Sequence, residues 1–137
     1  MKRYYFDTSI WLDFFENRDL PNIPKSKWAT KLIERIVKEN DRIIYSDANE
    51  EELIGQNYTH SEIEFLFSKI KGIMIGVEFT RAQFGKARDL AQKRSLPIFD
   101  ALHALIARDN KAMLITLDND FRKLKDITII KGPQEII

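Results

Sequence analysis

Short apolar runs alternate along the chain with longer segments in which apolar residues recur every three or four positions. The short runs are typical of buried strands, and the longer periodic segments are typical of amphipathic helices. The runs predict five strands, at Arg3–Phe6, Ile43–Tyr45, Ile73–Val77, Ala112–Thr116 and Ile127–Ile130. The last is expected to be an edge strand, and a tail that contains Pro133 follows it.

The periodic segments predict helices between these strands. In the second of them, Trp28, Leu32 and Ile36 recur at helical spacing. In the fourth, Ser61 followed by Glu64 matches a capping box, which predicts that the helix begins there. The expected helices are Ile10–Glu16, Trp28–Val37, Ala48–Gln56, Ser61–Ile70, Thr80–Arg94 and Phe99–Asp109, with a short helical turn at Asp120–Leu124.

This alternation indicates the fold class. Most of the predicted strands are apolar on both faces, which is typical of a parallel sheet that helices cover on either side. The sequence therefore predicts an α/β fold, a three-layer α/β/α sandwich with a mostly parallel central sheet of about five strands. A chain of 137 residues without repeats or linkers is expected to form a single domain over residues 1–137.

Composition narrows the possible functions. The chain is 44% hydrophobic and 31% charged, as expected of a soluble globular protein, and its net charge of +1 gives no global attraction to nucleic acid. Disulfides and thiolate zinc sites are excluded because there is no cysteine. No apolar run approaches the roughly 20 residues that span a bilayer, and the amino terminus turns acidic too early for a signal peptide. A cytoplasmic protein without membrane contact is expected.

Acidic residues recur at the positions where a predicted strand ends and the next helix begins. They are Asp7, the run Glu50 to Glu52, Asp100 and Asp118. Ligands of open parallel sheets bind outside the carboxyl ends of the strands, so these carboxylates are expected to converge. Because converging carboxylates repel one another, a hard divalent cation is the usual compensation. The sequence therefore predicts a metal site that holds Mg²⁺ or Mn²⁺.

Each acid also has a structural interpretation. Asp7 suits a helix N-cap, although Thr8 and Ser9 could cap as well. Asp118 lies in an Asp-Asn-Asp segment that suits a turn. Asp100 could cap a helix, but its surroundings are nearly all apolar, so function is favoured because an unpaired carboxylate there is costly. Among the three glutamates, Glu52 borders the core because Leu53 and Ile54 follow it, whereas Glu50 and Glu51 fit an exposed helical turn.

The four acidic segments together resemble the motifs of the PIN-domain ribonucleases and, in size and layout, the VapC-type toxins of toxin–antitoxin pairs. The motifs are Asp7-Thr8-Ser9, Ser46 with Glu52-Leu53 six residues later, Asp100-Ala101-Leu102-His103, and Thr116 to Phe121 around Asp118. The resemblance implies metal-dependent hydrolysis of RNA phosphodiester bonds by Asp7, Glu52, Asp100 and Asp118. Asn49 departs from the threonine that many members carry.

Other polar residues receive supporting roles. Hydroxyl and amide groups beside the acids could orient them or hold water, and the candidates are Ser9, Thr116, Asn119 and Asp120. His103 lies one helical turn beyond Asp100 and is interpreted as a packing residue. Arg122 and Lys123 are the candidates for binding the RNA backbone, because they lie close to Asp118.

Two classes of function remain open. The first is a metal-dependent ribonuclease, and the second is a catalytically weak module of the same fold that acts by binding RNA or protein. Phosphate transfer through an aspartyl nucleophile is disfavoured. Ser9 stands where a dehalogenase-type site needs a second aspartate, and the strand that ends at Thr116 offers no lysine for a receiver-type site.

Apolar residues crowd the first helix more densely than one helical face can bury. They are Ile10, Trp11, Leu12, Phe14 and Phe15, and the helix with Ile63, Leu66, Phe67 and Ile70 is a second apolar surface. Excess apolar surface marks a partner interface, and VapC-type relatives pair as homodimers and bind an antitoxin. A homodimer through these helices is therefore expected. The alternative is that the Asn17–Pro24 loop folds over the first helix.

Overall fold

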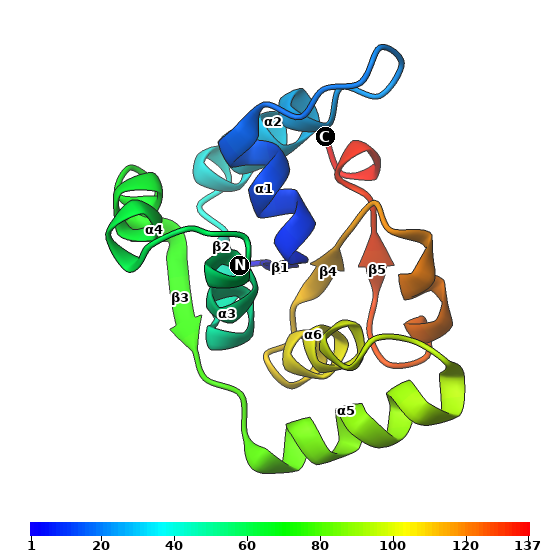
Figure 1. The fold of residues 1–137 in the computed structure, drawn as a ribbon. Helices are drawn as coiled ribbons and strands as arrows, with labels where there is room; N and C mark the ends of the chain where they lie inside the picture. Colours follow the sequence, from blue (N-terminus) through cyan, green and yellow to red (C-terminus); the bar gives the residue numbers. More distant parts are fainter.

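The computed structural model describes residues 1–137, and a sheet of five parallel strands runs through its centre (Figure 1). The strands are β1 (Arg3–Phe6), β2 (Arg42–Ser46), β3 (Met74–Val77), β4 (Met113–Ile115) and β5 (Ile130–Lys131). Their order is β3-β2-β1-β4-β5, and every neighbouring pair is parallel. The predicted α/β class is confirmed, and β5 is an edge strand as expected.

Helices lie between successive strands in the order that the sequence predicted. They are α1 (Thr8–Glu16), α2 (Lys25–Lys38), α3 (Asp47–Gly55), α4 (His60–Phe67), α5 (Arg81–Arg94) and α6 (Ile98–Asp109), with short 3-10 helices η1 (Lys71–Ile73), η2 (Asn119–Leu124) and η3 (Pro133–Glu135). None of the helices combines the length and the apolar character that a membrane crossing requires.

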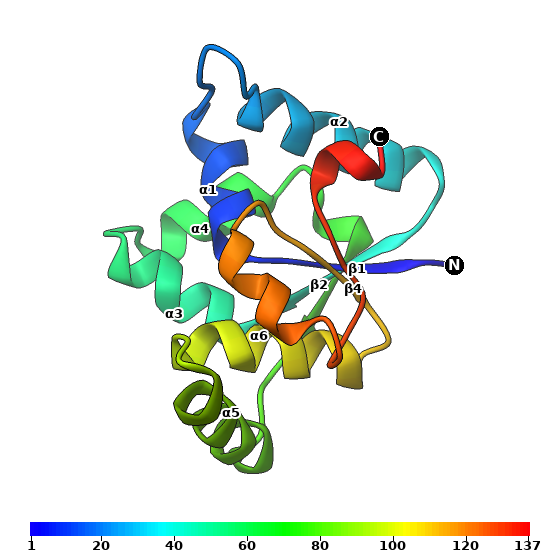
Figure 2. The ribbon, with the colours of Figure 1, turned by 90° about the vertical axis from the view of Figure 1, so that its right-hand side faces the viewer.

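Two separate apolar layers enclose the sheet. Helices α1 and α2 lie on one side of it, and α5 and α6 lie on the other (Figures 1 and 2). Because successive side chains of a strand point to opposite faces, Tyr4 and Phe6 enter the first layer and Tyr5 enters the second. All three are at most 3% exposed. The sequence of β1 thus supplies both halves of the core.

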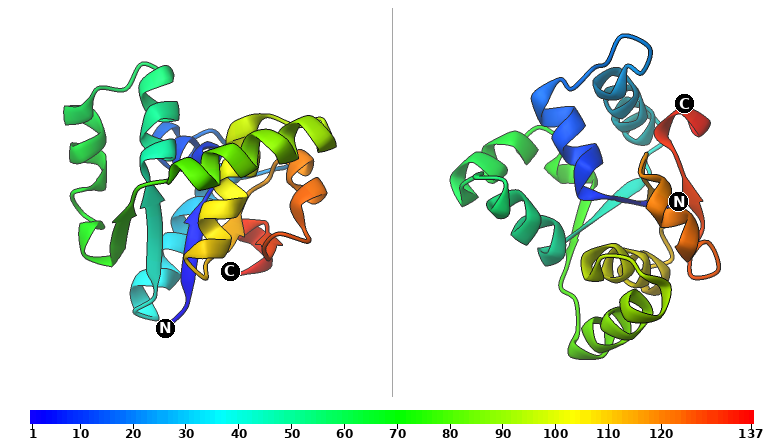
Figure 3. Two further views of the ribbon diagram at one scale, coloured as in Figure 1. Left: turned by 90° about the horizontal axis from the view of Figure 1, so that it is seen from below. Right: turned by 45° about the vertical axis from the view of Figure 1, so that its right-hand side comes forward.

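The carboxyl ends of the parallel strands meet at one edge of the sheet. Helix α1 begins there directly after β1, and α3 begins there directly after β2. Helix α6 runs back along the sheet toward the start of β4, so its first residues lie at the same edge (Figure 3). Helix η2 follows β4 and completes that edge. All four acidic segments of the sequence therefore lie at one end of the sheet.

The N-cap of helix α4 lies two residues earlier than the sequence predicted. Its N-cap is Thr59, whose Oγ1 accepts from the backbone N–H of Glu62 at 3.1 Å, while Glu62 Oε1 accepts from the Thr59 N–H at 3.1 Å. The predicted Ser61–Glu64 cap is wrong because two overlapping capping patterns occur here. With its N-cap at Thr59, the helix contains both Ile63 and Phe67, which lie one turn apart and are buried in the core.

Strand β5 begins later than predicted. The ladder with β4 pairs only Ile130 with Leu114 and Lys131 with Ile115, so residues 127–129 precede the strand. Strand β4 is only three residues long, which limits the number of partners that β5 finds. The apolar run from residue 127 instead includes Ile127, which packs against the second apolar layer without pairing in the sheet.

The first helix hides most of its apolar residues within the monomer. Ile10 and Trp11 are fully buried, and the Trp11 ring lies 4.7 Å from the ring of Phe67 and 6.3 Å from that of Tyr45, measured between centroids. Helix α2 also packs on α1. The loop at residues 17–23 is exposed and does not cover the helix. The prediction of excess exposed apolar surface on α1 is therefore wrong, and so is the alternative that the loop covers it. The residues that cover α1 come from α2, Tyr45 and Phe67, which are distant in the sequence.

Candidate metal centre

Asp7 joins the end of β1 to the end of β4. It is the N-cap of α1, and its Oδ1 accepts from the backbone N–H of Ser9 at 3.5 Å. Its Oδ2 accepts from Ser9 Oγ at 2.7 Å and from Thr116 Oγ1 at 2.9 Å. Thr116 Oγ1 in turn accepts from the backbone N–H of Asp118 at 3.0 Å. The capping interpretation of Asp7 therefore holds, and the carboxylate also lies in contact with the two hydroxyls that were expected to orient it.

Glu52 is the glutamate of α3 that faces both α1 and α6. Its Oε1 accepts from Thr8 Oγ1 at 2.7 Å and lies 2.5 Å from His103 Nε2, whereas its Oε2 receives no hydrogen bond. Glu50 instead contacts His60 Nδ1 at 3.2 Å, and Glu51 is exposed. The geometry therefore distinguishes Glu52 from its two neighbours, as the sequence register suggested.

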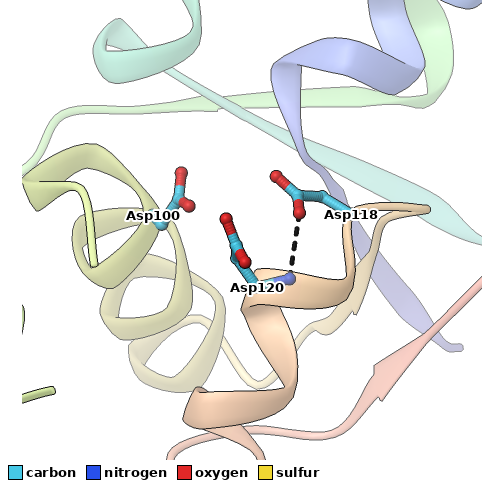
Figure 4. A group of neighbouring side chains, drawn as sticks. All are labelled: Asp100, Asp118 and Asp120. Atoms are coloured by element: carbon cyan, nitrogen blue, oxygen red, sulfur yellow. Dashed lines mark hydrogen bonds between the residues drawn. The ribbon is translucent and has the colours of Figure 1, made fainter. Parts of the chain in front are cut away.

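Three further carboxylates approach one another between α6 and η2 (Figure 4). Oxygen atoms of Asp100, Asp118 and Asp120 lie within 4.8 Å of one another. Asp118 is the N-cap of η2, and its Oδ1 accepts from the backbone N–H of Asp120 at 2.9 Å. Asp100 is half-buried and receives no hydrogen bond, so it does not cap α6, whose N-cap is Pro97. Asp120, which the sequence suggested as a supporting residue, is itself a member of this group of carboxylates.

The surroundings of Asp100 and Glu52 shift the pKa values of these two side chains in opposite directions. Burial, together with the nearby carboxylates of Asp7, Asp118 and Glu52, raises the pKa of Asp100 to about 7 against the opposing effect of His103. Burial also opposes ionisation of Glu52, but hydrogen bonds from His103 and Thr8 outweigh it and lower the pKa of Glu52. The protein thus stabilises Glu52 as a carboxylate, whereas Asp100 receives no hydrogen bond that would do the same.

The donor set fits a hard divalent cation. Carboxylate oxygens are the ligands that Mg²⁺ and Mn²⁺ prefer, and no cysteine competes for a softer metal. Asp7 and Glu52 lie outside the group formed by Asp100, Asp118 and Asp120, although they act electrostatically on Asp100. Asn119 lines a polar cavity of about 230 Å³ beside Asp118 and donates no hydrogen bond to a carboxylate.

We expect Asp100 to make the metal-free protein less stable as the pH rises. Its pKa is about 7 when folded and 3.8 ordinarily, so the folded state binds the extra proton between these values. The contribution is full below about pH 4 and is lost as the pH rises through about 7. That difference corresponds to about 4 kcal/mol at most, and solvent screening should leave about 1–2 kcal/mol.

Thermal unfolding in EDTA at pH 5 and pH 8 measures this loss as a fall in Tm of roughly 3–8 °C for a chain of this size. Asp100→Asn should remove the part of the fall that Asp100 causes. An unchanged fall in that variant would assign the pH dependence to other groups.

Sequence reasoning missed several side chains that contact the acids. His103 was interpreted as packing, and its ring does pack between those of Tyr5 and Phe99, at centroid distances of 5.4 and 6.2 Å. It also hydrogen-bonds Glu52 and the Tyr5 hydroxyl, at 2.5 and 2.6 Å. Thr8, next to Asp7, was treated only as another cap. Nothing in the local sequence of Tyr5 separates it from an ordinary core aromatic residue.

An all-parallel α/β fold with carboxylates gathered at its carboxyl edge is the class of protein that the geometry defines. The PIN domain family matches residues 4–127, and the chain therefore belongs to the PIN domain family. This confirms the resemblance seen in the four motifs. No curated protein sequence matches the chain significantly.

Solved structures of toxin–antitoxin complexes share the fold. A VapBC2 structure from Rickettsia felis, bound to a promoter DNA fragment, is 18% identical with a TM-score of 0.69, over 95% of this chain and 98% of that one. A toxin–antitoxin complex from Klebsiella pneumoniae is 20% identical with a TM-score of 0.67, over 95% and 97%. VapBC-1 from nontypeable Haemophilus influenzae is 21% identical with a TM-score of 0.66, over 96% and 98%. The VapC-type layout is thus confirmed at the level of the fold.

Proposed function

We propose that the protein is a metal-dependent endoribonuclease that hydrolyses RNA phosphodiester bonds and serves as the toxin of a toxin–antitoxin pair. The observation that carries this proposal is the gathering of carboxylates at the carboxyl edge of a PIN-domain sheet. They come from four different elements or their ends, and they are Asp7, Glu52, Asp100, Asp118 and Asp120. A site of this charge suits a divalent cation and, through it, a phosphate.

Asp7, Glu52, Asp100 and Asp118 are the residues that would hold the cation. When bound, Mg²⁺ or Mn²⁺ supplies positive charge for the scissile phosphate and promotes the formation of a water-derived nucleophile at neutral pH. Ser9 and Thr116 hold one oxygen of Asp7, and Thr8 and His103 hold one oxygen of Glu52. Both carboxylates are thereby oriented before a cation arrives, which reduces the cost of organising the site.

The RNA backbone has a candidate contact beside Asp118. Arg122, Lys125 and Lys131 line the polar cavity of about 230 Å³ that also contains Asp118 and Asn119. Lys123 is not among these residues, and its Nζ instead donates to the backbone carbonyls at the end of α5, at 3.2 and 3.3 Å. Of the two cations favoured from the sequence, only Arg122 thus faces this cavity. With a net charge of +1, RNA binding depends on such a local patch.

Removal of metal provides the direct test of the activity. We expect an end-labelled single-stranded RNA to be cleaved in the presence of Mn²⁺ or Mg²⁺, to be stable in EDTA, and to be cleaved again when Mn²⁺ is added in excess. The physical reason is that crowded carboxylates repel a phosphate until a cation neutralises them. A DNA strand of the same sequence is the matched substrate control.

Two results would contradict the proposal in different ways. Cleavage that persists at the same rate in EDTA would contradict the role of the metal. RNA that is bound in the presence of Mn²⁺ but never cleaved would favour the alternative, a catalytically weak module that acts by binding RNA or protein.

We also propose an antitoxin partner and a homodimer. The similar structures include complexes of a toxin with its antitoxin, and this chain covers nearly the whole of each matched chain. For self-association, Phe65 on α4 is 76% exposed beside an apolar hollow of about 380 Å³ that Phe15, Tyr58 and Leu66 line. Exposed aromatic surface beside a hollow of this kind is typical of an interface.

A further inference from the structure

A closed ring of hydrogen bonds lies directly behind Glu52. Its six members come from β1, β2 and the helices α1, α3 and α6, and they are Tyr5, Ser46, Asn49, Thr8, Glu52 and His103. Five of the six are buried, with exposed fractions between 0 and 4%, whereas the Glu52 side chain is 34% exposed. Glu52 is therefore the point at which a buried polar network reaches the metal centre.

One arm of the ring runs from α3 through α1 to Glu52. Asn49 Nδ2 donates to the Phe6 carbonyl at 3.1 Å and to Thr8 Oγ1 at 3.0 Å, which fixes how the Asn49 amide is turned. Because Thr8 Oγ1 accepts from Asn49, its own proton is free to donate to Glu52 Oε1, at 2.7 Å. This arm thus delivers a donor to one oxygen of Glu52.

The other arm runs from β2 through β1 and α6 to the same oxygen. Ser46 Oγ lies 2.6 Å from the Tyr5 hydroxyl, which lies 2.6 Å from His103 Nδ1. An ionised Glu52 can only accept, so His103 Nε2 carries the proton of that contact. The contacts of Ser46 with Tyr5, of Tyr5 with His103 and of His103 with Glu52 thus form an unbroken chain that ends on Glu52 Oε1.

Both arms therefore end on the same oxygen of the same carboxylate. Oε1 is held by Thr8 and His103, and Oε2 has no hydrogen-bond partner. A network that served only to satisfy buried polar groups would have no reason to end on a side chain that is one-third exposed. Hydrogen bonds behind a ligand are the usual means by which proteins orient it toward a metal.

We propose that Tyr5 and His103 are positioning residues, which act through the ring to hold Glu52 with its Oε2 available to the divalent cation. The inference rests on the proposed function, since it concerns the same metal centre. It assigns a role to a histidine and a tyrosine that touch no other acid of the site. It also explains why His103 is fully buried and yet hydrogen-bonded at both ring nitrogens.

Direct Mn²⁺ binding by the full chain tests the proposal without relying on activity. Calorimetric titration of Tyr5→Phe and His103→Leu should show Mn²⁺ affinity that is weaker by roughly 10–100-fold, the range typical of such outer partners. His103→Gln, whose amide can donate from a position near that of Nε2, should recover part of that loss. All titrations are made at a temperature at which circular dichroism shows each variant to be folded.

Tyr45→Phe is the matched control for Tyr5→Phe. It removes the same hydroxyl from a neighbouring strand, and the Tyr45 hydroxyl is buried without any hydrogen-bond partner. Its Mn²⁺ affinity should equal that of the wild type. If Tyr5→Phe and His103→Leu also bind Mn²⁺ within about twofold of the wild type while unfolding more easily, the ring is structural and the proposal is overturned.

The wild type separates this proposal from the proposed function. Wild-type protein that binds Mn²⁺ but cleaves no RNA would contradict the proposed ribonuclease activity. The positioning role of Tyr5 and His103 would then still be decided by the Mn²⁺ affinities of the variants. Cleavage by the wild type together with unchanged affinities in the variants would overturn the ring alone. Wild-type protein that binds no Mn²⁺ would overturn both.

Discussion

Substitution Asp100→Asn is expected to reduce metal-dependent RNA cleavage by more than about 100-fold. Asparagine keeps the size of the side chain but removes the charge that would bind the cation. Loss of an outer partner already costs roughly 10–100-fold in metal sites, so loss of a ligand should cost more. Cleavage of end-labelled RNA under single-turnover conditions at saturating Mn²⁺ measures the change.

The same variant should be more stable than the wild type when metal is absent. Asp100 is half-buried, receives no hydrogen bond and lies near four other carboxylates. A neutral side chain therefore lowers the cost of burial and removes the repulsion. Asp89→Asn, at an exposed position of α5, is the matched control and should change neither property. Wild-type cleavage by Asp100→Asn would show that the carboxylate is not required and would remove it from the proposed metal centre.

Substitution Phe65→Asp is expected to convert the proposed homodimer into monomers. Phe65 is 76% exposed on α4, next to the apolar hollow lined by Phe15, Tyr58 and Leu66. A carboxylate at a desolvated apolar contact cannot be paired and is costly to bury, which should weaken association by about 100-fold or more. Light scattering over a dilution series should give twice the 16.1 kDa chain mass for the wild type and the chain mass for the variant.

A control at another exposed apolar residue separates a specific contact from general solubility. Ile129 is 62% exposed and precedes the edge strand β5, so Ile129→Asp should leave the dimer intact. A wild-type mass near 16.1 kDa at every concentration would rule out the dimer. A dimer that survives Phe65→Asp would place the contact on another surface.

Much of the fold could be predicted because its signals are local. Strands β1 to β4 follow apolar runs, and the intervening helices follow apolar periodicity, so the order of the elements along the chain and the parallel class of the sheet could both be predicted. The order of the strands within the sheet was not predicted. The boundaries of the elements were harder to predict. For α4, Thr59 and Ser61 both offer a capping pattern, and only the burial of Ile63 and Phe67 decides between them. The late start of β5 likewise depends on the length of the strand beside it.

The sequence by itself determined the order of the elements and the placement of Asp7, Glu52, Asp100 and Asp118 at the carboxyl edge, because spacing along the chain controls both. Only the tertiary structure decided which atoms meet there. Tyr5 and His103 are 98 positions apart, and Asp7 and Thr116 are 109 apart. Their hydrogen bonds depend on how whole helices pack against the sheet, and no local propensity encodes that packing. For the same reason, the burial of Trp11 became visible only once α2, Tyr45 and Phe67 surrounded it.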